Sequence, residues 1–305
     1  MDSSAASSKV SGADLWQWWQ WACERAQVAG IERAEADWFL RAMSDVDSLA
    51  LKLGTFKQRP SVSVKASLDE LTERWQQRVE KRVPVQHLVG FTTWRNLTLQ
   101  VSPAVLIPRP ETELLIDLAV EAVNQSPDAE RLRRGIWVDL GTGSGAIALG
   151  LAQALPEAEI YAIDISEAAL AIARENARLN GLEHRITFRA GSWFTPLAHY
   201  QAQLAGIVSN PPYIPTATVQ TLEPEVMNHE PLLALDGGED GLEAIRTLVE
   251  QGPSQLSSGG LWLVEMMAGQ ADTVKALLLK QGAYEQVQIH ADLAGIERFG
   301  LAFRK

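Results

Sequence analysis

The chain has 305 residues, 46% of them apolar, and a formal net charge of −11 at neutral pH. This length exceeds the usual size of one hydrophobic core, so two domains are expected. The polar start, Met1 to Ser8, lacks the apolar segment of a signal peptide, and no apolar run reaches the roughly 20 residues that span a bilayer. We therefore expect a cytoplasmic protein that does not contact a membrane.

The cysteine and histidine content excludes two kinds of stabilising site. The one cysteine, Cys23, cannot form an internal disulfide, which fits a reducing compartment. One cysteine and five scattered histidines have no zinc-ligand spacing, so no metal is predicted. Because Cys23 lies among tryptophans at helical spacing, we expect a buried, unreactive thiol.

The charge is unevenly distributed along the chain. The first 90 residues carry 12 basic and 12 acidic side chains, so the whole excess of negative charge falls on the remainder. An acidic region of this size repels phosphate backbones and favours a neutral or basic partner. This balance argues against DNA or RNA as the substrate.

The N-terminal 83 residues are assigned to a small helical domain because their apolar residues recur at helical spacing. Ser11 and Asp14 resemble a capping box that begins a helix extending to about Val28. The apolar stripe of this helix is broad enough to be buried: Leu15, Trp18, Trp19, Ala22 and Cys23. Trp16 and Trp21 fall off the stripe, which leaves open whether they pack in the core or face a partner.

Two further helices are expected in this domain. The second spans residues 34–43, and the third begins at Ser67 with Glu70 as its capping-box partner. Their predicted inward side chains are Trp38, Phe39 and Ala42 in the second helix, and Leu68, Leu71 and Trp75 in the third. The stretch Pro60 to Val64 is predicted to be the loosest part of the domain.

A β-hairpin is expected to link this domain to the rest of the chain. Phe91–Trp94 and Leu97–Val101 have strand character and are joined across Arg95-Asn96. We assign residues 84–104 to this linker.

Residues 105–305 alternate between helical and strand patterns, which is typical of an α/β domain with a doubly wound, mostly parallel sheet. Seven strands are predicted, at residues 136–140, 159–163, 186–189, 204–209, 260–265, 284–290 and 298–303. The last two leave no room for a crossover helix and should be antiparallel neighbours. Ligands bind at the carboxyl ends of such strands. Several polar or aromatic residues lie at these ends: Asp139, Asp164, Ser192-Trp193 and Asn210.

Asn210-Pro211-Pro212-Tyr213 is the motif with the most chemical content. It directly follows an apolar strand, and its two prolines cannot continue a ladder. The carbonyl groups of this turn and the Asn210 side-chain oxygen are acceptors for the two N–H groups of an amide or amine. An ordinary turn with a packed tyrosine is the alternative interpretation, since short motifs also occur by chance.

A glycine-rich loop supplies the second motif. The strand at 136–140 is followed by Gly141-Thr142-Gly143-Ser144-Gly145 and then by a helical stretch. Glycines allow close approach of a ligand, and the N–H groups that begin a helix can face polar or negative ligand atoms. The spacing differs from the dinucleotide fingerprint, so phosphate binding is the weaker interpretation.

Asp164 ends the second strand of this pattern, 19 residues after Gly145. A carboxylate in this place can accept both hydroxyl groups of a ribose. The alternative is that Asp164 caps the following helix, a task that Ser166 could share. Together, the three features indicate a nucleoside cofactor beside a loop that grips an amide.

These residues resemble the S-adenosylmethionine-dependent methyltransferases of Rossmann-like fold. Asp139 to Gly145 is similar to their cofactor loop, and Asn210 to Tyr213 is similar to the catalytic motif of members that methylate amines and amides. Three further segments resemble the release-factor glutamine methyltransferases: Leu106-Ile-Pro-Arg-Pro-Glu-Thr-Glu113, His229-Glu-Pro-Leu-Leu-Ala-Leu-Asp-Gly-Gly238 and Asp292-Leu-Ala-Gly-Ile-Glu-Arg298. The resemblance extends from about Pro84 to the C-terminus.

The resemblance implies an activity and a set of roles. The substrate would be the glutamine of the Gly-Gly-Gln loop in peptide chain release factors, methylated on its side-chain nitrogen with S-adenosyl-L-methionine as donor. The implied catalytic residues are Asn210, Pro211 and Tyr213, with Pro212 also in contact with the substrate. The implied cofactor contacts are Gly141, Thr142, Gly143, Ser144, Gly145, Asp164, Trp193 and Asn210. The helical domain would recognise the rest of the release factor.

One departure from the family is visible. Where the family has Glu-Ile-Gly after the fifth strand, this chain has Glu265-Met266-Met267. A methionine is therefore expected near the cofactor in place of a small residue.

Other functions would use the same residues. A methyltransferase acting on another protein glutamine, as in a ribosomal protein, or on an exocyclic amine of DNA or RNA would share the Asn-Pro-Pro-Tyr chemistry. The acidic charge disfavours the nucleic-acid alternative. A non-catalytic cofactor-binding module would leave the Asn210 to Tyr213 motif without a purpose.

Overall fold

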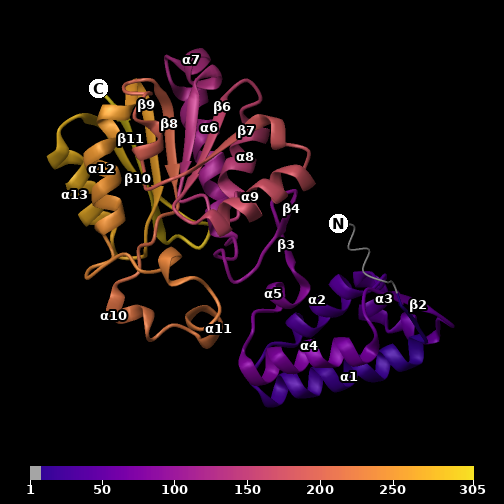
Figure 1. Ribbon diagram of the computed structural model, residues 1–305. Helices are drawn as coiled ribbons and strands as arrows, with labels where there is room; N and C mark the ends of the chain where they lie inside the picture. Colours follow the sequence, from indigo (N-terminus) through magenta and orange to yellow (C-terminus); the bar gives the residue numbers. More distant parts are fainter. Residues whose placement is uncertain (1–7) are drawn as a thin grey trace. The chain divides into compact units, whose positions relative to one another are not determined.

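The computed structural model describes residues 8–305, which form two compact units (Figure 1). One unit contains the described residues up to Gly90 together with Pro224–His229. The other contains Phe91–Glu223 and Glu230–Lys305. The first residues of the predicted helical domain, 1–7, lie outside the described part of the chain, as does most of the polar start.

The first unit is built mainly from helices. They are α1 (Gly12–Val28), α2 (Arg33–Met43), α3 (Ser48–Leu53), α4 (Leu68–Lys81), α5 (Val85–Val89) and the short α11 (Pro224–Met227). Ser11 begins α1 by accepting a hydrogen bond from the Asp14 backbone N–H at 3.0 Å. Ser67 and Glu70 form the complete capping box of α4. Both predicted helix starts are confirmed.

The tryptophan-rich face of α1 supplies much of this unit's core. Trp18 and Trp19 are buried, and their indole N–H groups donate to Thr72 Oγ1 at 3.0 Å and to Asp37 Oδ1 at 2.8 Å. Trp16 and Trp21 are partly buried and pack against the same core. Pairing each buried indole N–H with an acceptor avoids the cost of an unsatisfied donor.

Three predictions for this unit need correction. Cys23, expected to be buried, is only partly buried. The stretch predicted to be loosest contains β2 (Val62–Val64), which pairs antiparallel with β1 (Ser8–Val10). Val62 and Val64 are both buried. Side chains two positions apart on a strand point to the same face, so both valines point into the core. In α2, Phe39 is buried as predicted, whereas Trp38 and Ala42 are only partly buried. The buried face of α2 instead consists of Ala36, Phe39, Leu40 and Met43.

The second unit contains the predicted seven-stranded sheet. Its strands are β5 (Ile136–Leu140), β6 (Glu159–Asp164), β7 (Ile186–Ala190), β8 (Leu204–Ser209), β9 (Leu256–Glu265), β10 (Tyr284–Ala291) and β11 (Glu297–Arg304). They lie in the order β10-β11-β9-β8-β5-β6-β7. β5 to β9 pair in parallel, and β11 is antiparallel to both β9 and β10. The predicted α/β fold and the antiparallel final pair are confirmed.

Helices cover both faces of this sheet (Figure 1). One layer consists of α6 (Leu114–Gln125), α8 (Ala146–Ala154) and α9 (Glu167–Leu179), and the other of α12 (Glu243–Gln255) and α13 (Ala271–Gln281). Successive side chains of β5 point to opposite layers, Trp137 to the first and Val138 to the second. Gly206 on β8 leaves room for the Trp137 ring, because a Cβ atom there would lie 2.3 Å from it.

The predicted hairpin consists of β3 (Phe91–Trp94) and β4 (Leu97–Gln100), which pair antiparallel. Its turn places Arg95 in the left-handed region, at φ 52°. Asn176 of α9 holds β4 in place: its side chain accepts from the Gln100 N–H at 2.6 Å and donates to the Gln100 carbonyl at 3.0 Å. The hairpin thus packs within the second unit.

The remaining elements are short. They are α7 (Ala129–Arg134), α10 (Thr216–Val219), η1 (Thr55–Gln58), η2 (Glu111–Glu113), η3 (Glu183–Arg185), η4 (Thr195–Leu197) and η5 (Leu232–Ala234). Among the residues that the structure describes, no helix has the length and apolar character needed to cross a membrane.

Candidate active site

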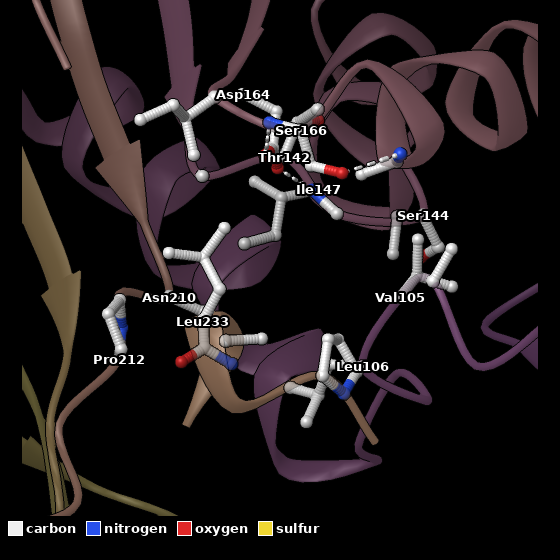
Figure 2. Close-up of a pocket in the computed structure, with 18 of the residues that line it drawn as sticks. Val105, Leu106, Thr142, Ser144, Ile147, Asp164, Ser166, Asn210, Pro212 and Leu233 are labelled. Atoms are coloured by element: carbon white, nitrogen blue, oxygen red, sulfur yellow. Dashed lines mark hydrogen bonds between the residues drawn. The ribbon is translucent and has the colours of Figure 1, made fainter. Parts of the chain in front are cut away.

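A cavity of about 220 Å³ opens at the carboxyl ends of the parallel strands of the second unit. Figure 2 shows Asp164, Ser166 and Thr142 on one side of it, Asn210 and Pro212 on another, and Val105 and Leu106 on a third. These residues come from the loops that follow β5, β6 and β8 and from the segment before η2. The topology therefore brings together segments that lie more than 100 residues apart in the sequence, such as those of Val105 and Asn210.

The glycine loop between β5 and α8 forms one wall. Gly141, Gly143 and Gly145 all have left-handed backbone angles, with φ of 74°, 53° and 84°. Residues with a Cβ atom rarely adopt these angles, which explains the glycines. A Cβ atom on Gly143 would meet no other atom within 4 Å, so this part of the loop faces open space.

Asp139 holds the glycine loop from behind. Its Oδ2 accepts from the Thr142 hydroxyl at 2.6 Å and from the Ala148 backbone N–H at 3.0 Å. The side chain is fully buried, and this burial raises its pKa to about 7. Asp139 thus shapes the loop rather than facing a ligand.

Asp164 lies where the glycine loop meets the end of β6. Its Oδ2 accepts from the Gly143 N–H at 2.8 Å, and its Oδ1 accepts from the Ser166 N–H at 2.9 Å. Ser166 caps α9, since its hydroxyl accepts from the Ala169 N–H at 3.2 Å. Burial raises the pKa of Asp164 above its ordinary value. A carboxylate offers about four acceptor positions, so Asp164 retains acceptor capacity beyond these backbone bonds.

Trp193 forms part of the same wall and has a strained backbone. Its φ is 48°, a left-handed value that costs a bulky residue on the order of 1–3 kcal/mol. Such strain is concentrated at ligand sites. Ile165, which sequence reasoning missed, also lines the cavity although it is 58% exposed. Its position directly after Asp164 was the available signal.

Asn210 follows β8 and lines the cavity with Pro212. Its side-chain Nδ2 donates to Thr112 Oγ1 at 3.2 Å. The strand end is held by Ser209, whose hydroxyl donates to the Leu140 carbonyl of β5 at 2.6 Å.

Pro211 and Tyr213 lie outside the set of residues that line the cavity. Tyr213 instead donates its hydroxyl to Glu265 Oε1 at 3.1 Å. Burial, together with the Glu265 carboxylate, raises the pKa of the Tyr213 hydroxyl. The predicted motif is therefore divided between the wall of the cavity, at Asn210 and Pro212, and the layer of side chains next to it.

Comparisons with known proteins identify the family. Residues 135–252 match a family model described as a methyltransferase domain. The chain is 49% identical over 293 residues to the release factor glutamine methyltransferase of Synechocystis sp., with 95% of this chain and 96% of that protein covered. It is 48% identical over 297 residues to the enzyme of the same name from Thermosynechococcus vestitus, with 96% and 99% covered. The chain belongs to the release factor glutamine methyltransferase family.

A solved structure with the same fold is the catalytic domain of hMettl16 in complex with a MAT2A 3′UTR hairpin. The two share 14% identity with a TM-score of 0.55, over 87% of this chain and 88% of that one. Similarity at this level of identity shows the fold alone.

An ion pair, missed in the sequence, connects two of the segments that carry the resemblance to this family. Arg109 Nη2 lies 2.8 and 2.9 Å from the two carboxylate oxygens of Glu230. Glu230 is buried, and burial raises its pKa against the opposing effect of Arg109. The pair therefore holds the segment before η2 against the segment before η5, on either side of the cavity that both help to line.

Met267, at which this chain departs from the family, lies outside the cavity. Its backbone N–H donates to Gln270 Oε1 at 3.0 Å, and it is outside the set of residues that line the cavity. Met266 is fully buried in the core. Neither methionine lines the cavity, and the expectation of a methionine beside the cofactor stays a prediction.

Proposed function

We propose that this protein transfers the methyl group of S-adenosyl-L-methionine to the side-chain nitrogen (N5) of the glutamine in the Gly-Gly-Gln loop of peptide chain release factors. The observation that carries the proposal is the placement of Asn210. Its Nδ2 is occupied by Thr112, which leaves Oδ1 as an acceptor in a cavity that also contains the glycine loop and Asp164. Membership of the release factor glutamine methyltransferase family supports the choice of substrate.

The residues around the cavity fit the cofactor. Gly141, Thr142, Gly143 and Ser144 line the cavity and would follow its outline, because the space next to Gly143 is open. Gly145 lies outside this lining, next to Ala173, and would support the loop from behind. Asp164 has free acceptor capacity for two ribose hydroxyl groups, and Trp193 and Ile165 offer apolar surfaces for a flat base. When bound, S-adenosyl-L-methionine supplies a sulfonium methyl group that needs no activation, and it becomes S-adenosyl-L-homocysteine.

The Asn210 to Tyr213 turn would hold the substrate amide. A carboxamide nitrogen is a weak nucleophile because its lone pair is delocalised into the carbonyl group. Asn210 Oδ1 and the Pro211 carbonyl can accept hydrogen bonds from its two N–H groups and orient the nitrogen toward the methyl group. Such positioning contributes roughly 7–11 kcal/mol of a barrier. As the C–N bond forms and the C–S bond of the donor breaks, the nitrogen becomes acidic and would release one of these two protons to solvent. Pro212 would contact the substrate, and Tyr213 would support the amide plane from the adjacent layer.

Different parts of the chain would have different roles in the reaction. We assign recognition of the release factor to residues 1–83, the connection to residues 84–104 and the transfer of the methyl group to residues 105–305. The negative charge of the larger part disfavours nucleic acid as the substrate. Translation termination, in which release factors act, would place the enzyme in the cytoplasm.

Mass spectrometry tests this function directly. A release factor is incubated with the protein and S-adenosyl-L-methionine, and the peptide that contains Gly-Gly-Gln is analysed. The proposal predicts the added mass of one methyl group on the glutamine, and far less addition in the same time with the Asn210→Ala variant. A methyl group on DNA, RNA or a ribosomal protein, with none on the release factor, would contradict it.

A further inference from the structure

Asn210 belongs to a group of polar side chains within the second unit that is largely shielded from solvent. Asn210 Nδ2 donates to Thr112 Oγ1 at 3.2 Å. The Thr112 side chain lies next to the Glu265 carboxylate and lowers its pKa as a hydrogen-bond donor does, and that carboxylate accepts from the Tyr213 hydroxyl at 3.1 Å. Thr112 lies in η2 and Glu265 ends β9, so three separate segments meet here. Thr112 is 4% exposed and Glu265 is fully buried.

The chemistry of these groups sets the direction of every hydrogen bond. An ionised carboxylate can only accept. Thr112 has one hydroxyl hydrogen, and the neighbouring Glu265 carboxylate is the acceptor that would take it. The Thr112 oxygen can then only accept, so Asn210 must turn its Nδ2 toward it. The Asn210 Oδ1 is thereby left to accept hydrogen bonds from a ligand. An Asn210 side chain turned the other way would present N–H donors to the N–H groups of a substrate amide.

We propose that Thr112 and Glu265 are positioning residues that hold the Asn210 carboxamide with its oxygen available to the substrate amide. This inference rests on the proposed function, in which Asn210 Oδ1 accepts an N–H group of the substrate amide. Thr112, in the segment before α6, and Glu265, the last residue of β9, thus act on the reaction by orienting Asn210.

The burial of Glu265 is hard to explain by packing alone. Its Oε2 lacks a hydrogen-bond partner among the described residues, and an unpaired buried carboxylate oxygen is costly. Burial raises the pKa of Glu265 to about 7, with Glu111 acting in the same direction and Thr112, Tyr213 and Arg298 opposing it. A neutral glutamine of the same shape would avoid this cost. Such unfavourable groups are concentrated at functional sites.

Two substitutions at one position separate orientation from packing. Thr112→Ser keeps the hydroxyl, whereas Thr112→Val keeps the shape and removes it. We expect kcat for methyl transfer to release factor to stay within a few-fold of the native value in Thr112→Ser. In Thr112→Val it should fall by roughly 10-fold or more. The KM for release factor, the Kd for S-adenosyl-L-methionine and the melting temperature should be similar in the two variants.

Glu265→Gln tests the carboxylate of this group. An amide can either donate or accept, so the variant no longer dictates the direction of the Thr112 hydroxyl. We expect a loss of several-fold in kcat, and much less additional loss when the substitution is made in the Thr112→Val background. The native kcat should also fall as the pH drops through about 7, where Glu265 becomes protonated, and this limb should be missing from the profile of Glu265→Gln.

Three results would overturn the inference. The first is an equal kcat for Thr112→Val and Thr112→Ser, whether both variants keep the native value or both lose activity. The second is a Glu265→Gln enzyme with the native rate and pH profile. The third is a loss of kcat from Glu265→Gln that is as large in the Thr112→Val background as in the native enzyme. Failure of the proposed function has a different signature, since the native protein itself would then transfer no methyl group to release factor, and the inference would fall with it.

Discussion

The buried indole groups of the helical unit and two buried carboxylates near the cavity of the second unit differ in how completely they are paired. In the helical unit, Trp18, Trp19 and Trp75 each pair their indole N–H with an acceptor. Around the cavity, Asp139 and Glu265 are fully buried with their pKa values raised to about 7, and each has one oxygen without a partner among the described residues. The first pattern stabilises a fold. The second retains unfavourable groups where chemistry needs them.

Backbone strain follows the same division. Trp193 and the left-handed glycines Gly141 and Gly143 line the cavity. In the helical unit, the left-handed residues Gly54, Arg82 and Gly90 directly follow α3, α4 and α5, where such angles end helices at little cost. Substitutions in one region should therefore change activity, and substitutions in the other should change stability.

The largest expected effect is that of Asn210→Ala. It removes the acceptor for one substrate N–H, so the single-turnover rate of methyl transfer should fall by roughly 100-fold or more. Asn210→Asp still accepts and should be less damaged. Cofactor affinity should survive in both, because the glycine loop and Asp164 lie on other strands. Near-native transfer by Asn210→Ala would return this residue to the status of a turn residue.

Arg78→Met should have a comparable effect, but on stability. Arg78 is 4% exposed, and its guanidinium group lies 2.7 Å from Glu35 and 2.8 Å from Glu225, both within the helical unit. Loss of the cation leaves two partly buried carboxylates facing each other, which should cost about 3 kcal/mol of unfolding free energy. Urea unfolding measures this cost. The methyl-transfer rate on a short Gly-Gly-Gln peptide serves as the control and should not change.

Asp164→Ala should weaken cofactor binding with the fold intact. Hydrogen bonds to a charged group contribute roughly 1.5–3 kcal/mol, so the Kd for S-adenosyl-L-methionine should rise at least tenfold. Isothermal titration calorimetry gives this constant. An unchanged Kd would show that the assignment of the ribose to Asp164 is wrong.

The smallest effect concerns the pH dependence of stability. The pKa of Glu265 is raised from 4.5 to about 7 in the folded protein, so the folded state binds more protons than the unfolded state between these values. Its contribution to stability is therefore lost as the pH rises through this window. Glutamine does not titrate. The melting temperature of Glu265→Gln minus that of the native protein should therefore be about 2–4 °C higher at pH 8 than at pH 4.5. Equal differences at the two pH values would contradict a buried, titrating carboxyl.

Local patterns in the sequence were sufficient for much of the fold and part of the site. Ser11 and Ser67 begin their helices through bonds to residues three positions away. The Gly141 to Gly145 loop follows β5, and Asp164 ends β6, at the predicted positions. In each case the interactions or backbone angles involved lie within a few residues, so a short stretch of sequence contains the information. The period-2 and period-3.6 patterns carry the strands and helices in the same way.

Only the tertiary structure decided which distant residues meet. Asn210 lies 98 residues from Thr112, and Tyr213 lies 52 residues from Glu265. Glu225 belongs to the helical unit although about 130 residues separate it from Gly90, where the first part of that unit ends. The buried β2 strand arises because its valines meet the core formed by α1, α2 and α4. These contacts depend on how whole elements pack, and the burial that raises the pKa of Glu265 exists only once β9, η2 and the loop after β8 have come together.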